Sequence, residues 1–175
     1  RARFLARDGT TVIGEKEWPP GARLGHQDAI EFLFAWARNG VLGEHRIAGV
    51  GHRVVHGGER FAAPSLVDDT LVAELEAIVP LARLHQPHNV AAIRAVATMA
   101  PAMRQVACFD TAFHGTQPPV AQTFALPRRY ADEGVRRYGF HGLSYEYVAS
   151  VLPRDDVGAD PPARTVVAHL GNGAS

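Results

Sequence analysis

The sequence predicts an α/β domain, because stretches with the apolar pattern of strands alternate with stretches that have the pattern of helices. Its 175 residues suit one domain, and a hydrophobic fraction of 46% is normal for a globular core. An acidic residue, Asp110, directly follows a short apolar strand, the position at which open α/β sheets place ligand chemistry. We therefore expect one α/β domain with a site near the carboxyl end of that strand.

Strands are expected at both ends and in the middle of the chain. The first two form a hairpin, in which residues 3–7 and 11–13 are joined by a turn at Asp8-Gly9-Thr10. Further strands are expected over 47–55, 105–109 and 165–170. The last of these leads directly into a glycine-rich turn.

Helices are expected where apolar residues recur three and four positions apart. They cover 27–38, about 70–79, a stretch that begins near 89, and a stretch that follows Gly142 and ends before Pro153. Asp69 and Ser144 are candidate N-caps. The expected inward faces consist of Ile30, Leu33, Phe34 and Ala37; Leu71, Leu75, Ile78 and Val79; Val90, Ile93, Val96 and Ala97; and Tyr147, Val148 and Val151. The polar stretch 153–162 is the segment most like a linker.

Charge and composition exclude several classes of protein. The formal net charge is +0 at pH 7, which argues against an electrostatic nucleic-acid binder and a polybasic membrane anchor. The single cysteine, Cys108, fits a reducing compartment, and no apolar run is long enough to span a bilayer. We expect a cytoplasmic protein. The chain lacks an initiator methionine and stops just after a glycine turn, so we also expect a piece of something longer.

The stretch GHRVVHGGERF, residues 51–61, combines a cation with apolar side chains. In a strand, Arg53 and Val55 share one face, because side chains alternate. A planar guanidinium beside hydrocarbon suits a ligand with a carboxylate at one end and a short hydrocarbon at the other. Gly57-Gly58 indicates a close approach by a ligand or another loop. An ordinary edge strand with a solvated arginine and structural histidines explains the pattern equally well.

Further motifs are ambiguous when taken singly. Asp110 can hold a metal, act as a base or cap the next segment, and His141 lies at a helix start, where anions are favoured. The turn at 171–173 has a phosphate-cradling pattern but equally fits a hairpin. His85 and His88 are better explained as hydrogen-bonded loop residues than as a metal pair.

Taken together, the motifs resemble the acetate kinase family, the acetokinases. The matching strings are GHRVVHGGERF, LARLHQPHN, FDTAFHGTQPP, ALPRRY, GVRRYGFHGLSYEYVA and HLGNGAS, and they cover about residues 50–175. The resemblance implies an actin-like, ribonuclease-H-like fold, as in sugar kinases and actin. It implies reversible phosphoryl transfer from ATP to acetate, giving acetyl phosphate and ADP with Mg²⁺. It also implies a homodimer for the full-length protein, formed mainly through a second domain.

The resemblance assigns roles by position. Arg53 corresponds to the arginine that binds the substrate carboxylate, and His85 to a substrate-site histidine. Val55, Leu84 and Phe140 correspond to walls of the acetate methyl pocket, while Asp110 and His141 correspond to the catalytic aspartate and the histidine that steadies the transferring phosphoryl group. The nucleotide phosphate loop corresponds to His169, Leu170, Gly171, Asn172 and Gly173. No residue is assigned as a metal ligand.

The sequence also departs from the family pattern. Gln86 and His88 stand where Asn and Pro are usual, and the family's opening Asn-Ala-Gly-Ser-Ser-Ser loop has no counterpart. Residues before Gly49 match weakly. We therefore expect residues 1–175 to be an incomplete N-terminal, acyl-substrate domain that ends at the start of the phosphate loop. The alternatives are a propionate or butyrate kinase of the same family, a histidine-based metal hydrolase and a non-catalytic binding domain.

Overall fold

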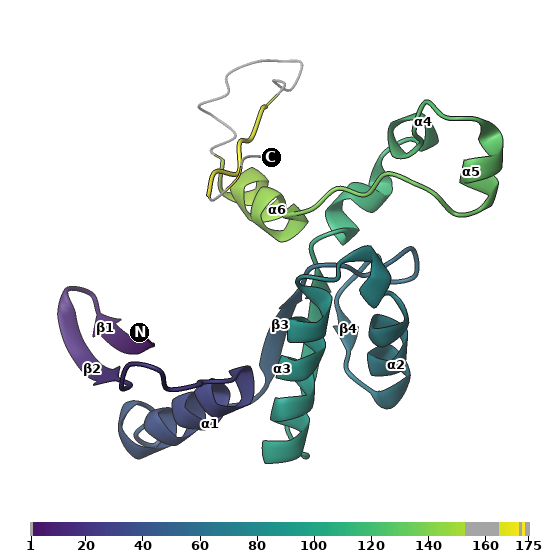
Figure 1. Ribbon diagram of the computed structural model, residues 1–175. Coiled ribbons are helices and arrows are strands. Elements are labelled where there is room, and N and C mark those ends of the chain that lie inside the picture. Colours follow the sequence, from purple (N-terminus) through teal and green to yellow (C-terminus); the bar gives the residue numbers. More distant parts are fainter. Residues whose placement is uncertain (1, 153–164, 172, 174–175) are drawn as a thin grey trace.

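A small mixed sheet forms the centre of the computed structural model, which describes residues 2–152, 165–171 and 173 (Figure 1). Strand β3 (Val50–Val54) pairs in parallel with β5 (Gln105–Phe109), and the two-residue β4 (Ser65–Leu66) pairs antiparallel with β5 on its other side. The connection from β3 to β5 contains α2 (Asp69–Ala77) and α3 (Gln86–Met99). The predicted α/β class is confirmed.

The hydrophobic core lies between this sheet and helices α2 and α3. Helices α2 and α3 contribute most of their predicted apolar faces, and Leu75 and Val54 are both fully buried. In the other two predicted helices, Leu33, Tyr147 and Val151 were expected to face inward but are exposed. The buried cluster consists of Val54, Leu71, Val72, Leu75, Val90, Ile93, Ala107 and Phe109. One prediction for α3 was wrong, because Ala95 is buried while Ala97 is exposed.

The ends of α2 and α3 differ from those predicted. Asp68, not Asp69, is the N-cap of α2, since its Oδ1 accepts a hydrogen bond of 2.7 Å from the backbone N–H of Leu71. Helix α3 begins at Gln86, three residues before the expected start, with Pro87 in its first turn, where the fixed φ of proline favours a helix. As a result, Gln86 and Asn89 project from the first turn of one helix.

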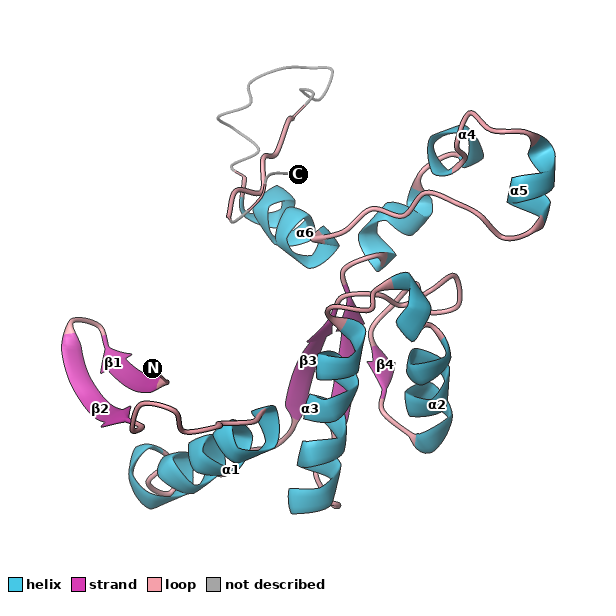
Figure 2. Ribbon diagram, viewed as in Figure 1, coloured by secondary structure: helices cyan, strands magenta, loops and turns pink. Residues whose placement is uncertain are grey.

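The N-terminal part is a hairpin-and-helix unit whose helix packs against α3 (Figures 1 and 2). Strands β1 (Arg3–Asp8) and β2 (Thr11–Glu17) pair antiparallel, as predicted, and α1 (His26–Trp36) continues into a π-helical turn, Ala37–Val41. Phe4 packs edge-on against Phe32 and Trp36, with centroids 5.0 and 4.9 Å apart. These aromatic contacts hold the hairpin on α1.

After β5 the chain extends away from the sheet and then returns to it (Figure 2). It forms a 3₁₀ turn (Ala112–Thr116) and the short helices α4 (Pro119–Gln122) and α5 (Arg128–Asp132), and returns at α6 (Gly142–Val151). An ion pair of 2.7 Å between Arg136 Nη1 and Glu59 Oε2 ties the returning segment to the loop after β3.

Two further element predictions were wrong. Residues 165–170 show only an isolated bridge at Leu170, and Val166 is 94% exposed. A strand needs a neighbour to complete its ladder of hydrogen bonds, so alternation alone does not produce one. Ser144 is not the cap of α6; the N-cap position is occupied by His141. The predicted linker over 153–162 lies outside the described residues.

Candidate active site

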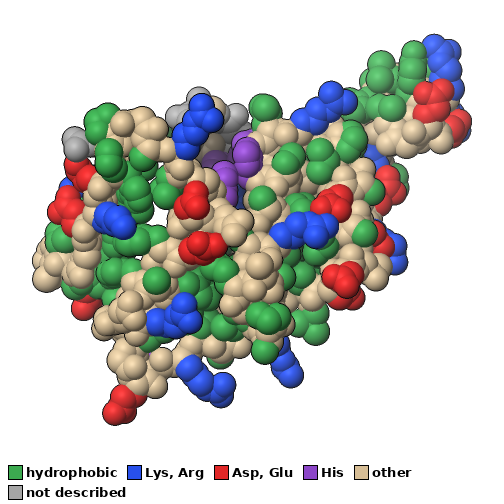
Figure 3. Space-filling view, turned by 60° about the horizontal axis from the view of Figure 1, so that its bottom comes forward, with side chains coloured by type: hydrophobic (Ala, Val, Ile, Leu, Met, Phe, Trp, Pro, Cys, Tyr) green, Lys and Arg blue, Asp and Glu red, His purple; other side chains and the backbone are tan. Residues whose placement is uncertain are grey.

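A cavity of about 310 Å³ lies beyond the carboxyl ends of β3 and β5, between the first turns of α3 and α6. The described residues that line it are Arg53, Val55, His85, Asn89, Asp110, His141 and His169. Figure 3 shows histidine side chains gathered beside a hollow in the surface. Five elements of the chain therefore supply polar groups to one place.

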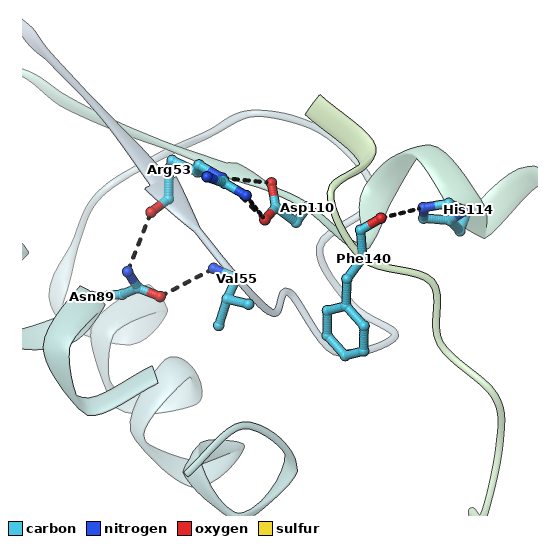
Figure 4. A network of polar contacts seen from close by, with 6 residues as sticks. All are labelled: Arg53, Val55, Asn89, Asp110, His114 and Phe140. Carbon is cyan, nitrogen blue, oxygen red and sulfur yellow. Dashed lines mark hydrogen bonds and ion pairs between the residues drawn. The ribbon is translucent and has the colours of Figure 1, made fainter. Parts of the chain in front are cut away.

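Arg53 and Asp110 form a bidentate ion pair at the ends of two adjacent strands (Figure 4). Arg53 Nε donates to Asp110 Oδ1 and Oδ2 at 3.0 and 3.1 Å, and Arg53 Nη2 donates to Oδ2 at 2.8 Å. The Asp110 side chain is 1% exposed, whereas that of Arg53 is 58% exposed. These hydrogen bonds raise the pKa of Arg53. The pair uses one edge of a guanidinium that carries five N–H donors, so the other edge remains for a ligand.

Val55 and Asn89 form the wall next to this ion pair. Val55 lies just beyond β3 on the same side as Arg53, as the strand alternation predicted. Asn89 was not predicted as a site residue; its Oδ1 accepts from the backbone N–H of Val55 at 3.1 Å. Its place directly after the His85–His88 loop was the available signal, but the sequence does not reveal which way the amide points.

His141 holds an unusual backbone position at the mouth of the cavity. Among the residues that the structure describes, His141 is the one non-glycine residue whose φ is positive, at 58°. It occupies the N-cap position of α6. The next residue, Gly142, donates its N–H to the carbonyl of Asp110 at 2.9 Å, so the start of α6 is joined directly to the end of β5. A non-glycine residue kept in the left-handed region by its surroundings often marks a functional site.

His141 stacks on His169 at the cavity. Their ring centroids are 3.9 Å apart, and the rings are nearly parallel, at 3°. Burial lowers the pKa of His141, and the neighbouring His169 lowers it further. Both rings line the cavity in which the phosphate chemistry was predicted. The lowered pKa of His141 favours the neutral form of its ring.

Of the remaining predicted site residues, some line the cavity and others do not. His85 lines the cavity, but Leu84 is 81% exposed and does not, and Phe140 packs its ring edge-on against His56. In the phosphate loop, His169 lines the cavity, Leu170, Gly171 and Gly173 are exposed, and Asn172 lies outside the described residues. The roles assigned to these residues remain predictions.

Several of the other histidines have local structural partners. His52 Nε2 donates to Gln105 Oε1 at 2.7 Å, His56 Nδ1 accepts from the N–H of Gly58 at 2.9 Å, and His88 stacks on His26. His114 Nε2 contacts the carbonyl of Phe140 at 2.9 Å. Within residues 2–152, 165–171 and 173, no three His, Cys, Asp or Glu side chains form a group that could hold a metal ion.

Gly57 and Gly58 serve the packing of the loop that follows β3. A Cβ at Gly57 would lie 2.8 Å from both the Phe109 ring and the carbonyl of Phe61, and Gly58 has a φ of 65°. The close approach predicted from Gly57-Gly58 is confirmed, and the partner is the protein's own core.

No helix among the described residues has the length and apolar character needed to cross a bilayer.

The fold is of the actin-like class, and two solved structures share it. A propionate kinase from Francisella tularensis subsp. tularensis SCHU S4 matches with a TM-score of 0.78 and 31% identity, covering 98% of this chain and 43% of that one. Porphyromonas gingivalis acetate kinase matches with a TM-score of 0.74 and 37% identity, covering 91% of this chain and 40% of that one.

The sequence comparison gives the family. The model of the acetokinase family matches residues 6–175, and the chain belongs to that family. It is 55% identical over 173 residues to an acetate kinase from Rhodopseudomonas palustris (strain TIE-1), covering 99% of this chain and 42% of that protein. It is 53% identical over 175 residues to an acetate kinase from Rhizobium meliloti, covering 100% of this chain and 44% of that protein.

These findings confirm the predicted family and correct its extent. The family match begins at residue 6, so the part before Gly49, which was expected to match weakly, belongs to it as well. The chain spans less than half the length of the curated relatives it matches.

Proposed function

We propose that this chain supplies the acid-binding part of an enzyme that transfers a phosphoryl group reversibly between ATP and acetate, giving acetyl phosphate and ADP. The observation that carries the proposal is the Arg53–Asp110 pair, which holds a half-exposed guanidinium beside Val55 in one small cavity. A cation next to a short apolar wall matches a short-chain carboxylate. Relatives at 53–55% identity bear the name acetate kinase.

The reaction needs little acid–base chemistry. An acetate oxygen attacks the γ-phosphorus of ATP, the new O–P bond forms, and the bond to the bridging oxygen of ADP breaks. Acetate is already ionised at neutral pH, so no proton has to leave the nucleophile. Catalysis then consists mainly of alignment and of stabilising charge on the transferring group.

Each residue of the cavity has a role in this scheme. Arg53 orients the carboxylate through its ligand-facing N–H groups, and Val55 receives the methyl group. His141 donates a hydrogen bond to an equatorial oxygen of the phosphoryl group, as a largely neutral ring at neutral pH because its pKa is lowered. His85 contacts the acid substrate, and His169 contacts the phosphates. Leu84 and Phe140 are not among the described residues that line the cavity, so Val55 supplies the apolar wall.

Asp110 acts in this scheme by orienting Arg53. Both of its carboxylate oxygens accept hydrogen bonds from the guanidinium, and its side chain is buried. Because the guanidinium occupies both oxygens, this carboxylate is poorly placed to abstract a proton from a substrate. The geometry therefore favours an electrostatic and positioning role over general-base catalysis.

The residues present also fit a nucleotide-borne magnesium ion. Mg²⁺ commonly binds through one or two carboxylates together with substrate phosphates and waters, and Asp110 is the one carboxylate among the described lining residues. Asp110 would hold the ion directly or through a water. When bound, the ion would neutralise charge on the β- and γ-phosphates.

The wider organisation follows from the same proposal. Residues 1–175 would form the N-terminal, acyl-substrate domain, with ATP or ADP entering from the side of the 169–173 loop. The full-length enzyme would be a cytoplasmic homodimer that acts on small molecules, without nucleic-acid or membrane partners. A propionate kinase activity is the second candidate, because a solved propionate kinase shares the fold.

The experiment that tests the proposal is substrate profiling of the purified full-length enzyme and of its Arg53→Ala variant. With ATP and Mg²⁺, the wild-type protein should phosphorylate acetate better than propionate or butyrate. The preference should be modest, since one methylene in an apolar pocket is worth about 1–3 kcal/mol. Arg53→Ala should lose most acetate-dependent turnover.

A matched control is Arg94→Ala, which removes an exposed arginine that pairs with Glu76 away from the cavity. This variant should keep wild-type kinetics. Near-normal acetate kinetics in Arg53→Ala would contradict the role of the guanidinium. A higher kcat/KM for propionate than for acetate in the wild-type enzyme would favour the second candidate.

A further inference from the structure

The segment that carries Arg53 and Val55 is held by a helix at the point where the sheet releases it. The last sheet-type contact of β3 is the hydrogen bond of 3.0 Å from the N–H of Asp110 to the carbonyl of Val54. On its other edge, Asn89 of α3 satisfies the backbone (Figure 4): Oδ1 accepts from the N–H of Val55 at 3.1 Å, and Nδ2 donates to the carbonyl of Arg53 at 3.4 Å. One side chain thus takes the place of a neighbouring strand.

A second side-chain amide, that of Gln86 in the same helical turn, also binds the backbone that follows β3. Gln86 is fully buried, and its Nε2 donates to the carbonyl of His56 at 3.0 Å. Gln86 and Asn89 are three positions apart and therefore lie on one face of α3. Together they fix the backbone on both sides of Val55, where no sheet ladder is present among the described residues.

We propose that Asn89 is a positioning and specificity-determining residue for the acid substrate. It sets the spacing between the Arg53 guanidinium and the Val55 side chain, because its amide bridges the backbone groups of those two residues. That spacing decides which length of carboxylic acid can contact the cation and the apolar wall at once. Asn89 also lines the cavity, so its amide limits the room beside Val55. This inference rests on the proposed function.

A purely structural role explains Asn89 less well. It lies inside the first turns of α3, whose N-cap is His85, so its side chain does not cap the helix. Asparagine is a weaker helix former than alanine, and the position is only partly buried. The core contacts of this turn come from Gln86 and Val90, both buried. Helix propensity and core packing therefore do not account for asparagine at this position, whereas its two hydrogen bonds to the backbone of Arg53 and Val55 do.

The test compares Asn89→Ala with the wild-type enzyme by measuring kcat and KM for acetate, propionate and ATP. The KM for acetate should rise ~10-fold, because small errors in the placement of reacting groups are costly. The KM for ATP should stay within about twofold, and the ratio of kcat/KM for acetate over propionate should move toward one. Thermal unfolding of each variant checks that it is folded.

Two further variants sharpen the result. Thr98→Ala removes another side-chain hydrogen bond from α3, that of Thr98 Oγ1 to the carbonyl of Arg94 at 2.9 Å, at the end far from the cavity; it should change none of the kinetic constants. Asn89→Asp keeps the acceptor for the N–H of Val55 but loses the donor to Arg53. It should fold even where Asn89→Ala does not, and it should also raise the KM for acetate.

The outcomes separate this inference from the proposed function. If the wild-type enzyme prefers acetate but both Asn89 variants keep its acetate KM and its acid selectivity, the inference is wrong and the proposed function stands. A uniform loss of kcat for both acids with unchanged selectivity would also overturn it, because that is what a structural role predicts. A wild-type enzyme that phosphorylates neither acid would overturn both.

Discussion

Arg53 and Asp110 show how one pair of residues can serve both stability and substrate binding. A buried carboxylate is costly unless it is paired, and Arg53 supplies the pairing from the adjacent strand. Because Arg53 is held along one edge and is 58% exposed, the pair remains accessible to a ligand. The aspartate is therefore a fixed support for the cation that the substrate meets.

This arrangement predicts how the enzyme responds to loss of the Asp110 charge. Asp110→Asn should lower kcat/KM for acetate across the whole pH range, because Arg53 loses its charged, bidentate partner at every pH. The measurement is the pH profile of kcat/KM from about pH 5.5 to 9. The exposed Asp132→Asn, in α5, is the matched control and should follow the wild-type profile. A variant that merely shifts one limb of the profile would instead indicate that Asp110 transfers a proton.

At the scale of elements, the sequence predicts what local pattern determines. The hairpin, α1, α2, α3, β3, β5 and α6 were all expected close to their observed places, because each has a clear apolar period or turn signal. The two-residue β4 and the π-helical turn Ala37–Val41 were missed, since neither has such a signal. The expected strand at 165–170 shows the opposite error: the sequence has the pattern of a strand, but these residues form no ladder of hydrogen bonds with a neighbouring strand among the described residues.

The site follows the same division. The motifs assigned Arg53, Val55, Asp110, His85 and His141 to one site only through the family resemblance, and the structure brings these residues to one cavity. They did not reveal that Arg53 pairs with Asp110 or that Asn89 bridges Arg53 and Val55, because these contacts join residues 57, 36 and 34 positions apart. Contacts across such separations depend on how the elements pack.

The junction between β5 and α6 gives a prediction at this scale. A Cβ at Gly142 would lie 2.3 Å from the carbonyl of Asp110 and 2.6 Å from Cβ of Phe113, so α6 could start here only after a backbone shift. Gly142→Ala should therefore destabilise the protein by about 1–3 kcal/mol and misplace His141. Denaturant unfolding and acetate kinetics measure the two effects.

Gly115→Ala is the control for that substitution. Gly115 lies in the neighbouring 3₁₀ turn, and a Cβ there would meet nothing within 4 Å. Its stability and activity should stay close to those of the wild type. Equal stability of Gly142→Ala and Gly115→Ala would show that α6 is not fixed against the end of β5.

At the scale of the whole molecule, several partly or fully buried histidines make stability depend on pH. Burial lowers the pKa of His52, of His56 and of His141. The unfolded chain takes up protons on these rings near pH 6.5, whereas the folded protein resists until lower pH. The unfolded state thus binds more protons as pH falls below 6.5, so the free energy of unfolding must decrease in that range.

His56 should contribute much of this effect, because its ring is almost fully buried and its Nδ1 accepts a hydrogen bond from the N–H of Gly58. Protonation of Nδ1 would break that bond inside the protein. His56→Gln replaces the ring by an uncharged side chain whose amide oxygen can still accept from Gly58. The fall in Tm between pH 7.5 and pH 5.5 should therefore be smaller in His56→Gln than in the wild type. His45→Gln, at an exposed histidine, is the control that should keep the wild-type slope. An unchanged slope in His56→Gln would mean that the acid sensitivity arises from other groups.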